Sequence, residues 1–170
     1  MIYAFDSYYF TDHSQTAAVA FANWTDAKPA ATYLASLPIK EEYISGEFYK
    51  RELPGILKVL KQIDLQPGDL LVVDGYVHLN DEGKLGLGGH LYEQLATKVP
   101  VVGVAKKRFL SVDKLLREVR RGKSDRPLFV TAVGMEVGEA AGAVLGMDGT
   151  YRLPTLLKLA DTLCRENTAQ

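Results

Sequence analysis

Residues 70–75 read LLVVDG, in which four apolar side chains in a row are followed by an aspartate and a glycine. An apolar run of this length, bounded by turn residues, is typical of a strand that is buried on both faces of a sheet. The same pattern returns in VVGVAK (101–106) and LFVTAV (128–133), and apolar residues repeat with helical spacing in KRELPGILKVLKQI (50–63). The sequence therefore predicts a sheet whose central strands are connected by helices.

The N-terminal region predicts a hairpin, because IYAFD (2–6) and TAAVAFANW (16–24) are strand-like and a polar turn separates them. The remaining elements are expected to be a glycine-rich loop at 81–89, a helix at 90–98, a basic and partly helical stretch at 110–122, and helices near 136–146 and 154–166. Hairpin strands followed by helix-linked strands indicate an α/β fold with a mixed sheet. The sequence contains no repeat or linker, so one domain over residues 1–170 is expected.

Composition narrows the class of protein. The 170 residues are 47% hydrophobic and 24% charged, which is the composition of a globular domain with a sizeable core. A net charge of −1 gives no overall basicity that would indicate a nucleic-acid partner. No apolar stretch is long enough to cross a membrane and the N-terminus does not resemble a secretion signal, so we expect a cytoplasmic protein without membrane contact. The single cysteine, Cys164, excludes an internal disulfide and a cysteine-based zinc site.

Acidic residues stand where the predicted elements would gather them. Asp6 ends the first strand, Asp74 ends the central strand, Glu52 lies near the start of the long helix, and Asp161 lies in the last helix. Carboxylates brought together repel one another, and a divalent cation relieves that repulsion. Hard oxygen ligands suit Mg²⁺ or Mn²⁺, and such ions can activate water for phosphodiester cleavage.

Each of these residues also fits an ordinary structural role. Asp74 with Gly75 is a good turn signal, Asp6 can open the hairpin turn, Glu52 suits a helix N-terminus, and Asp161 can be a solvated helix residue. The residues taken one by one leave both interpretations open.

Four segments occur in the order seen in the endonuclease V family: YISGEFYKRELP (43–54), LVVDG (71–75), GGHLYEQLATKVPVVGVAKKRF (88–109) and YRLPTLLKLAD (151–161). The chain resembles this family from Asp6 to Asp161, and the segments are specific in combination. The resemblance implies a ribonuclease H-like fold, a mixed sheet flanked by helices. It also implies a Mg²⁺- or Mn²⁺-dependent endonuclease that cuts DNA or RNA 3′ to a deaminated base such as inosine.

The resemblance assigns roles position by position. It implies that the metal ligands are Asp6, Glu52, Asp74 and Asp161, and that Lys106 acts with the first three in catalysis, near the scissile phosphate. Tyr43 matches the tyrosine of the family's strand-separating loop, although a half-buried packing role fits it as well. The nuclease reading also implies phosphate contacts for Lys107, Arg108, Arg120 and Arg121, whose ordinary alternative is a solvated face.

Some segments depart from the family pattern. The separating loop reads EYIS without its prolines, residues 76–80 replace the glycine and the HPR segment that usually follow, and GMEVGE (134–139) lacks a GHR-like sequence. His78 falls near the usual histidine position. These differences concern substrate recognition, so phosphodiester hydrolysis is the firmer expectation and inosine specificity the weaker one. The alternative function is a noncatalytic nucleic-acid or protein-binding module that keeps the fold.

Overall fold

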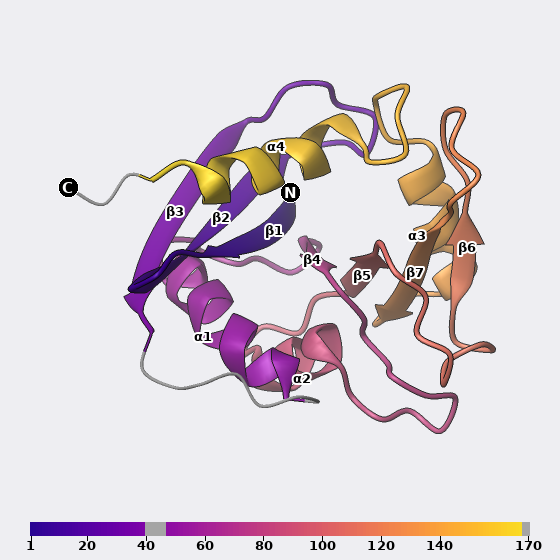
Figure 1. Cartoon of the computed structure of the whole chain (residues 1–170), viewed down its shortest axis with the longest axis horizontal. Coiled ribbons are helices and arrows are strands. Elements are labelled where there is room, and N and C mark those ends of the chain that lie inside the picture. The colour runs from indigo at the N-terminus through magenta and orange to yellow at the C-terminus, as the bar shows by residue number, and fades with distance from the viewer. Residues whose placement is uncertain (40–46, 168–170) are drawn as a thin grey trace.

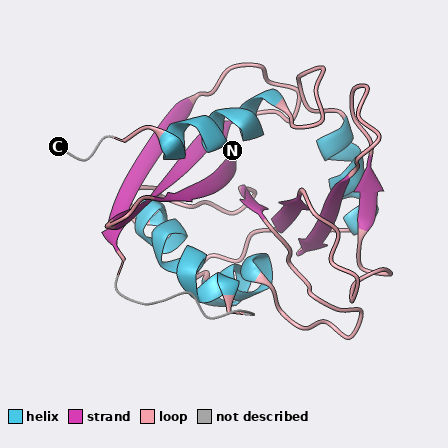
Figure 2. Ribbon diagram, viewed as in Figure 1, coloured by secondary structure: helices cyan, strands magenta, loops and turns pink. Residues whose placement is uncertain are grey.

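The computed structural model describes residues 1–39 and 47–167, and these form a mixed seven-stranded sheet with helices on both faces (Figure 2). In chain order the elements are β1 (Ile2–Tyr9), β2 (His13–Phe21), β3 (Ala31–Pro38), α1 (Phe48–Leu60), β4 (Leu70–Asp74), α2 (Leu87–Gln94), β5 (Val101–Ala105), β6 (Arg117–Val119), β7 (Leu128–Val133), α3 (Val137–Leu145) and α4 (Thr155–Arg165). None of the helices in the described residues has the length and apolar character needed to span a membrane.

The strand order across the sheet is β3-β2-β1-β4-β5-β7-β6. The central strands β1, β4 and β5 are parallel, and antiparallel strands extend the sheet on both sides. Phe5 is the register partner of Val73, and Asp74 is the partner of Val104. Since parallel strands end at the same edge, this register brings Asp6, Asp74 and the residue that follows β5 to one place.

The sheet is covered on both faces, as Figure 1 shows, by α1 and α2 on one side and by α3 and α4 on the other. Side chains of β1 alternate between these layers: Tyr3 and Phe5 pack with α1 and α2, whereas Ile2 and Ala4 pack with α3 and α4. The apolar side chains of β4 and β5 are buried on both faces, which explains their continuous apolar sequences.

Gly103 of β5 lies where the chain crosses above the sheet after β4. A Cβ atom at this position would lie 2.5 Å from the carbonyl oxygen of Gly75 and 3.0 Å from the backbone nitrogen of Val77. The Val77 N–H donates a hydrogen bond of 2.8 Å to Thr131 Oγ1 on β7. A side chain on residue 103 would therefore occupy the space that the segment after Asp74 uses.

The expected hairpin, the central strands and the C-terminal helices are confirmed, with shifts of a few residues at their ends. The helix predicted at 90–98 begins at Leu87, because Gly88 and Gly89 are helical positions packed closely on Val77. The partly helical stretch predicted at 110–122 is wrong: it contains β6, an edge strand whose charged residues hid the strand pattern. The edge strand β3 was not predicted.

Candidate active site

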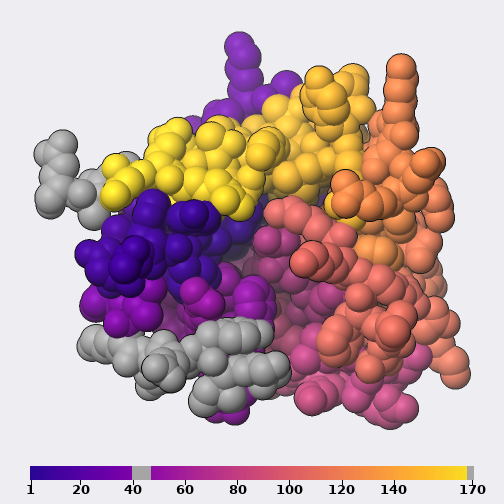
Figure 3. All heavy atoms as spheres, in the orientation of Figure 1, coloured from indigo at the N-terminus to yellow at the C-terminus, as the bar shows by residue number. Residues whose placement is uncertain are grey.

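The carboxylates of β1 and β4 meet above the end of β4. The Ser7 N–H donates a hydrogen bond of 2.8 Å to Asp6 Oδ1, and Lys106 Nζ lies 3.5 Å from Asp74 Oδ2. These three site residues, Asp6, Asp74 and Lys106, line one small hollow that is partly open to solvent. Figure 3 shows a depression below α4, between the N-terminal strands in indigo and the segment after β5 in salmon.

Asp161 joins the acidic group from α4, which covers the other face of the sheet from α1. Asp161 is only 7% exposed. Both of its carboxylate oxygens form ion pairs: Lys158 Nζ lies 2.9 Å from Oδ2, and Arg165 Nε lies 2.8 Å from Oδ1. One ligand atom each of Asp6, Asp161 and Cys164 lie within 4.8 Å of one another. Asp161 therefore lies near Asp6, and its role as a metal ligand stays a prediction. Cys164 is a neighbour that the sequence analysis treated as packing only.

The C-terminal end of α4 is attached to β2 by a buried side chain. Gln15 is fully buried, and its Nε2 donates hydrogen bonds to the carbonyl oxygens of Leu163, Cys164 and Glu166. These carbonyls belong to the last turn of α4, where intrahelical donors run out. Gln15 thus fixes the helix that carries Asp161.

Glu52 approaches from α1, which packs unusually close to the sheet. A Cβ atom on Gly55 would lie 2.2 Å from Thr16 Oγ1, so the glycine allows the helix to contact β2 directly. Glu52 is 8% exposed, and the hydroxyl donors of Tyr9 and Ser7 act on its pKa in the lowering direction, against the larger, raising effect of burial. The sequence analysis missed these two donors, although their alternation along β1 places both on the α1 face.

Burial and mutual repulsion disturb the titration of these groups. Burial, followed by repulsion from Asp74, raises the pKa of Asp6 to about 7, and burial raises the pKa of Glu52 to about 7. Burial also raises the pKa of Asp74, against the opposing charge of Lys106. For Lys106 burial lowers the pKa, but the nearby carboxylates outweigh burial and the net shift is upward. The site thus concentrates negative charge that the fold only partly neutralises.

The donor set fits a hard divalent cation. Asp6, Glu52, Asp74 and Asp161 offer carboxylate oxygens, the ligands that Mg²⁺ and Mn²⁺ prefer. The raised pKa values of Asp6 and Glu52 reflect a cost that a bound cation would remove. The protein supplies part of the positive charge that a cation would bring. Lys106 pairs with Asp74, and Lys158 and Arg165 pair with Asp161.

We expect the metal-free protein to lose stability as the pH rises from about 4 to about 7. In this window the folded state binds more protons than the unfolded chain, because Asp6 and Glu52 titrate near 7 only when folded. The loss should amount to several kcal/mol, since each carboxyl group whose pKa rises from about 4 to about 7 contributes up to about 4 kcal/mol. Chemical denaturation at several pH values in EDTA measures it, and Asp6→Asn should flatten the profile. A free energy of unfolding that rises across this window would contradict the prediction.

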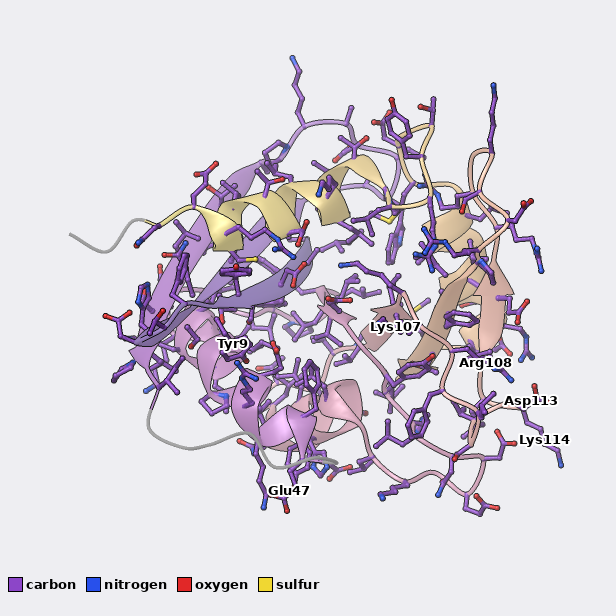
Figure 4. All side chains as sticks on the ribbon, viewed as in Figure 1. Tyr9, Glu47, Lys107, Arg108, Asp113 and Lys114 are labelled. Atoms are coloured by element: carbon purple, nitrogen blue, oxygen red, sulfur yellow. The ribbon has the colours of Figure 1, made fainter. Side chains whose placement is uncertain are left out.

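The predicted phosphate contacts occupy different environments. Lys107 is exposed and Arg108 is half-buried, with its Nη2 2.9 Å from Asp113 Oδ1. In Figure 4 both lie to the right of Tyr9, on the segment that follows β5. Arg120 is exposed at the sheet edge, with its Nη2 3.7 Å from Glu118 Oε2.

Arg121 differs from the other basic residues. It is 5% exposed, and its guanidinium donates hydrogen bonds to main-chain carbonyls of residues 147–152. This position gives Arg121 a structural role in place of the phosphate contact predicted from the sequence. Its basic neighbours in the sequence gave no sign of this burial.

Departures from the family pattern have structural roles of their own. Tyr76 Oη donates to the carbonyl of Lys107 and accepts a hydrogen bond of 3.0 Å from the Phe109 N–H, so it anchors the loop after β5. His78 forms a β-bridge with Leu85, and burial lowers the pKa of its imidazole. Tyr43, the residue expected to separate strands, lies outside the described residues.

A comparison with protein-family models decides the family. The model for endonuclease V matches residues 1–162. The chain belongs to the endonuclease V family. The expected ribonuclease H-like fold is confirmed by solved endonuclease V structures. The one from Streptomyces avermitilis has a TM-score of 0.72 and 26% identity, covering 96% of this chain and 79% of the other.

Other endonuclease V proteins agree in fold and sequence. The Ciona intestinalis protein, solved in complex with a 24mer DNA containing an inosine followed by a ribo-adenosine, has a TM-score of 0.80, with 97% of this chain and 84% of the other covered. At 19% identity this likeness concerns the fold alone. The Streptomyces coelicolor endonuclease V is 35% identical over 143 residues, which span 72% of this chain and 59% of that protein. The chain thus matches about three fifths of that endonuclease V.

Proposed function

We propose that this chain is a Mg²⁺- or Mn²⁺-dependent endonuclease that hydrolyses a phosphodiester in DNA or RNA, 3′ to a deaminated base such as inosine. The observation that carries the proposal is the partly buried acidic group, in which Asp6 and Glu52 have pKa values near 7 and Lys106 Nζ lies 3.5 Å from Asp74 Oδ2. Membership of the endonuclease V family and the inosine-containing DNA bound to the Ciona intestinalis relative support the choice of reaction and substrate.

Each side chain has a distinct task in this proposal. Mg²⁺ or Mn²⁺, held by Asp6, Glu52, Asp74 and Asp161, would supply the Lewis acidity that activates water and stabilises the leaving oxygen. Lys106 offsets negative charge on the phosphate, because its side chain lines the hollow and is 37% exposed.

Other residues keep the ligands in place. Ser7 and Tyr9 place hydroxyl groups on the Glu52 side of β1 and lower the pKa of that carboxylate, which favours its charged form. Lys158 and Arg165 orient Asp161 through hydrogen bonds from within α4. Such support keeps acidic side chains at fixed positions despite their repulsion.

A cleavage panel tests the proposal. The substrates are single- and double-stranded DNA and RNA, each with and without one inosine, incubated with Mg²⁺, with Mn²⁺ or with EDTA. We expect metal-dependent cutting, strongest 3′ to inosine. No cleavage of any substrate at high protein concentration, together with no Mn²⁺ binding that depends on Asp6 and Asp74 in calorimetry, would favour a noncatalytic binding module instead.

The loop that follows β5 carries Lys107 and Arg108 and is called the basic loop here. We expect it to contribute to nucleic-acid binding in a salt-dependent way. Lys107→Ala combined with Arg108→Ala should weaken binding to single-stranded DNA roughly tenfold at low salt, because two phosphate contacts are lost. The slope of log affinity against log salt should become shallower by about 1–2 units, measured by fluorescence anisotropy. Lys28→Ala with Lys61→Ala removes the same charge from exposed positions elsewhere and serves as the control. Equal slopes for both double variants would contradict a role for the loop.

A further inference from the structure

Tyr151 is an aromatic side chain that the fold leaves in solvent. It is 80% exposed, and among the large apolar side chains of the described residues only Leu110 is more exposed. The hydrophobic clusters of the described part of the chain do not include it. A tyrosine ring combines a large apolar surface with a polar hydroxyl group, so a tyrosine that the core leaves out is available to contact a partner.

The backbone that carries Tyr151 is held firmly in contrast. The buried Arg121 donates a hydrogen bond of 2.7 Å to the Tyr151 carbonyl, and further hydrogen bonds to the preceding carbonyls of the same loop. Arg152 donates to the carbonyls of Arg126 at 2.9 Å and Pro127 at 2.8 Å. Two guanidinium groups thus fix a loop whose most exposed member is an aromatic ring. A fixed backbone reduces the entropy lost when such a ring binds.

The same contacts place this loop at the candidate active site. Arg152 also donates to the carbonyl oxygen of Lys106, and Leu153 lines the hollow that holds Asp6 and Asp74. Tyr151 is therefore within two residues of the hollow along the chain. The loop on the other side of Lys106 presents the exposed Lys107 and Leu110.

We propose that Tyr151 stacks on a nucleobase of a single-stranded segment of the bound nucleic acid. The inference rests on the proposed nuclease function and adds a contact that neither the carboxylates nor the basic loop supplies. Arg152, next to Tyr151, contacts the Lys106 main chain, so the Tyr151 loop adjoins the segment that carries Lys106 and the exposed Lys107, and these cations favour a polyanion. An exposed aromatic ring combined with cationic side chains is an arrangement that binds single-stranded nucleic acid. Every base offers a π-face, so this contact supplies affinity without reading the sequence.

The test measures binding in EDTA, where no cleavage occurs, to a labelled single-stranded oligonucleotide of about 16 nucleotides. Tyr151→Ala should weaken binding roughly tenfold, whereas Tyr151→Phe, which keeps the ring, should bind within about twofold of the wild type. Leu145→Ala removes another exposed apolar side chain, from α3, and should bind like the wild type. Thermal melting should be unchanged in all three variants, since these side chains are exposed.

A reporter variant makes the stacking directly visible. Tyr151→Trp should lose fluorescence on oligonucleotide binding, against the constant signal of Trp24 in the wild-type protein. Unchanged affinity of Tyr151→Ala, or an equal loss of its affinity for fully paired duplex, would overturn the inference. If the wild type cuts its substrates while Tyr151→Ala binds the oligonucleotide as tightly as the wild type does, only the stacking role of Tyr151 is contradicted. If the wild type binds no oligonucleotide and cuts none, the proposed function falls with it.

Discussion

Asp74→Asn is expected to lower the rate of metal-dependent cleavage by at least about 100-fold. Asn keeps the shape of the side chain but removes the negative charge that would hold the cation and that pairs with Lys106 at 3.5 Å. Lys106 then loses the partner that orients its ammonium group toward the hollow. Single-turnover cleavage of an inosine-containing oligonucleotide measures the effect, and anisotropy with the same oligonucleotide should show binding within about threefold of the wild type.

The fold itself should tolerate this change. Burial raises the pKa of Asp74, so its charge is a burden on the folded state and Asn should leave the melting temperature equal or higher. Asp64→Asn is the matched control, because Asp64 is an exposed carboxylate that precedes β4. Cleavage by Asp74→Asn at the wild-type rate would remove Asp74 from the site. Loss of binding together with cleavage would assign it to substrate affinity instead.

Gly103→Ala is expected to lower the free energy of unfolding by about 2–4 kcal/mol. The added methyl group would lie 2.5 Å from the Gly75 carbonyl oxygen, 2.8 Å from Thr131 Oγ1 and 3.0 Å from the Val77 nitrogen. Two of these are backbone atoms, which cannot rotate aside as a flexible side chain would. Either the segment after Asp74 lifts away from the sheet or β5 moves, and both distort the position of Asp74.

The same substitution in open space provides the comparison. Gly142 of α3 has no atom within 4 Å of the position that a Cβ would take, and Gly142→Ala should raise the free energy of unfolding by up to about 1 kcal/mol. Urea denaturation of the two variants measures effects of opposite sign. A Gly103→Ala variant as stable as the wild type would contradict the crossing of the chain above β5.

The sheet could be predicted because its central strands have a recognisable local sequence pattern. The run at 70–75 is apolar on both faces, and its position between helical segments fixes the parallel order. Lateral neighbours are harder to predict. Arg117 and Glu118 of β6 are exposed and charged, and only pairing with β7 makes the segment a strand. Edge strands of this kind depend on tertiary contacts that periodicity does not reveal.

In the candidate site, too, some features could be predicted from the sequence and others could not. Asp74 ends β4 and Asp6 lies within β1 beside that end, so a prediction that the two strands are parallel neighbours already brings them together. The environment of Asp161 depends on Lys158 and Arg165, one helical turn away on either side, and that spacing was available in the sequence. The burial of Arg121 was not, because its partners are main-chain carbonyls of a loop that lies elsewhere in the sequence.

The hydrogen bonds between Gln15 and the end of α4 affect when the acidic group is assembled during folding. The first strand carries Asp6, and the last helix carries Asp161 and reaches its place only by docking on β1 and β2. During synthesis on the ribosome the early strands emerge long before this helix does. The acidic group is therefore completed among the last steps of folding, and a chain cut short before α4 would carry the basic loop but an incomplete metal-ligand set.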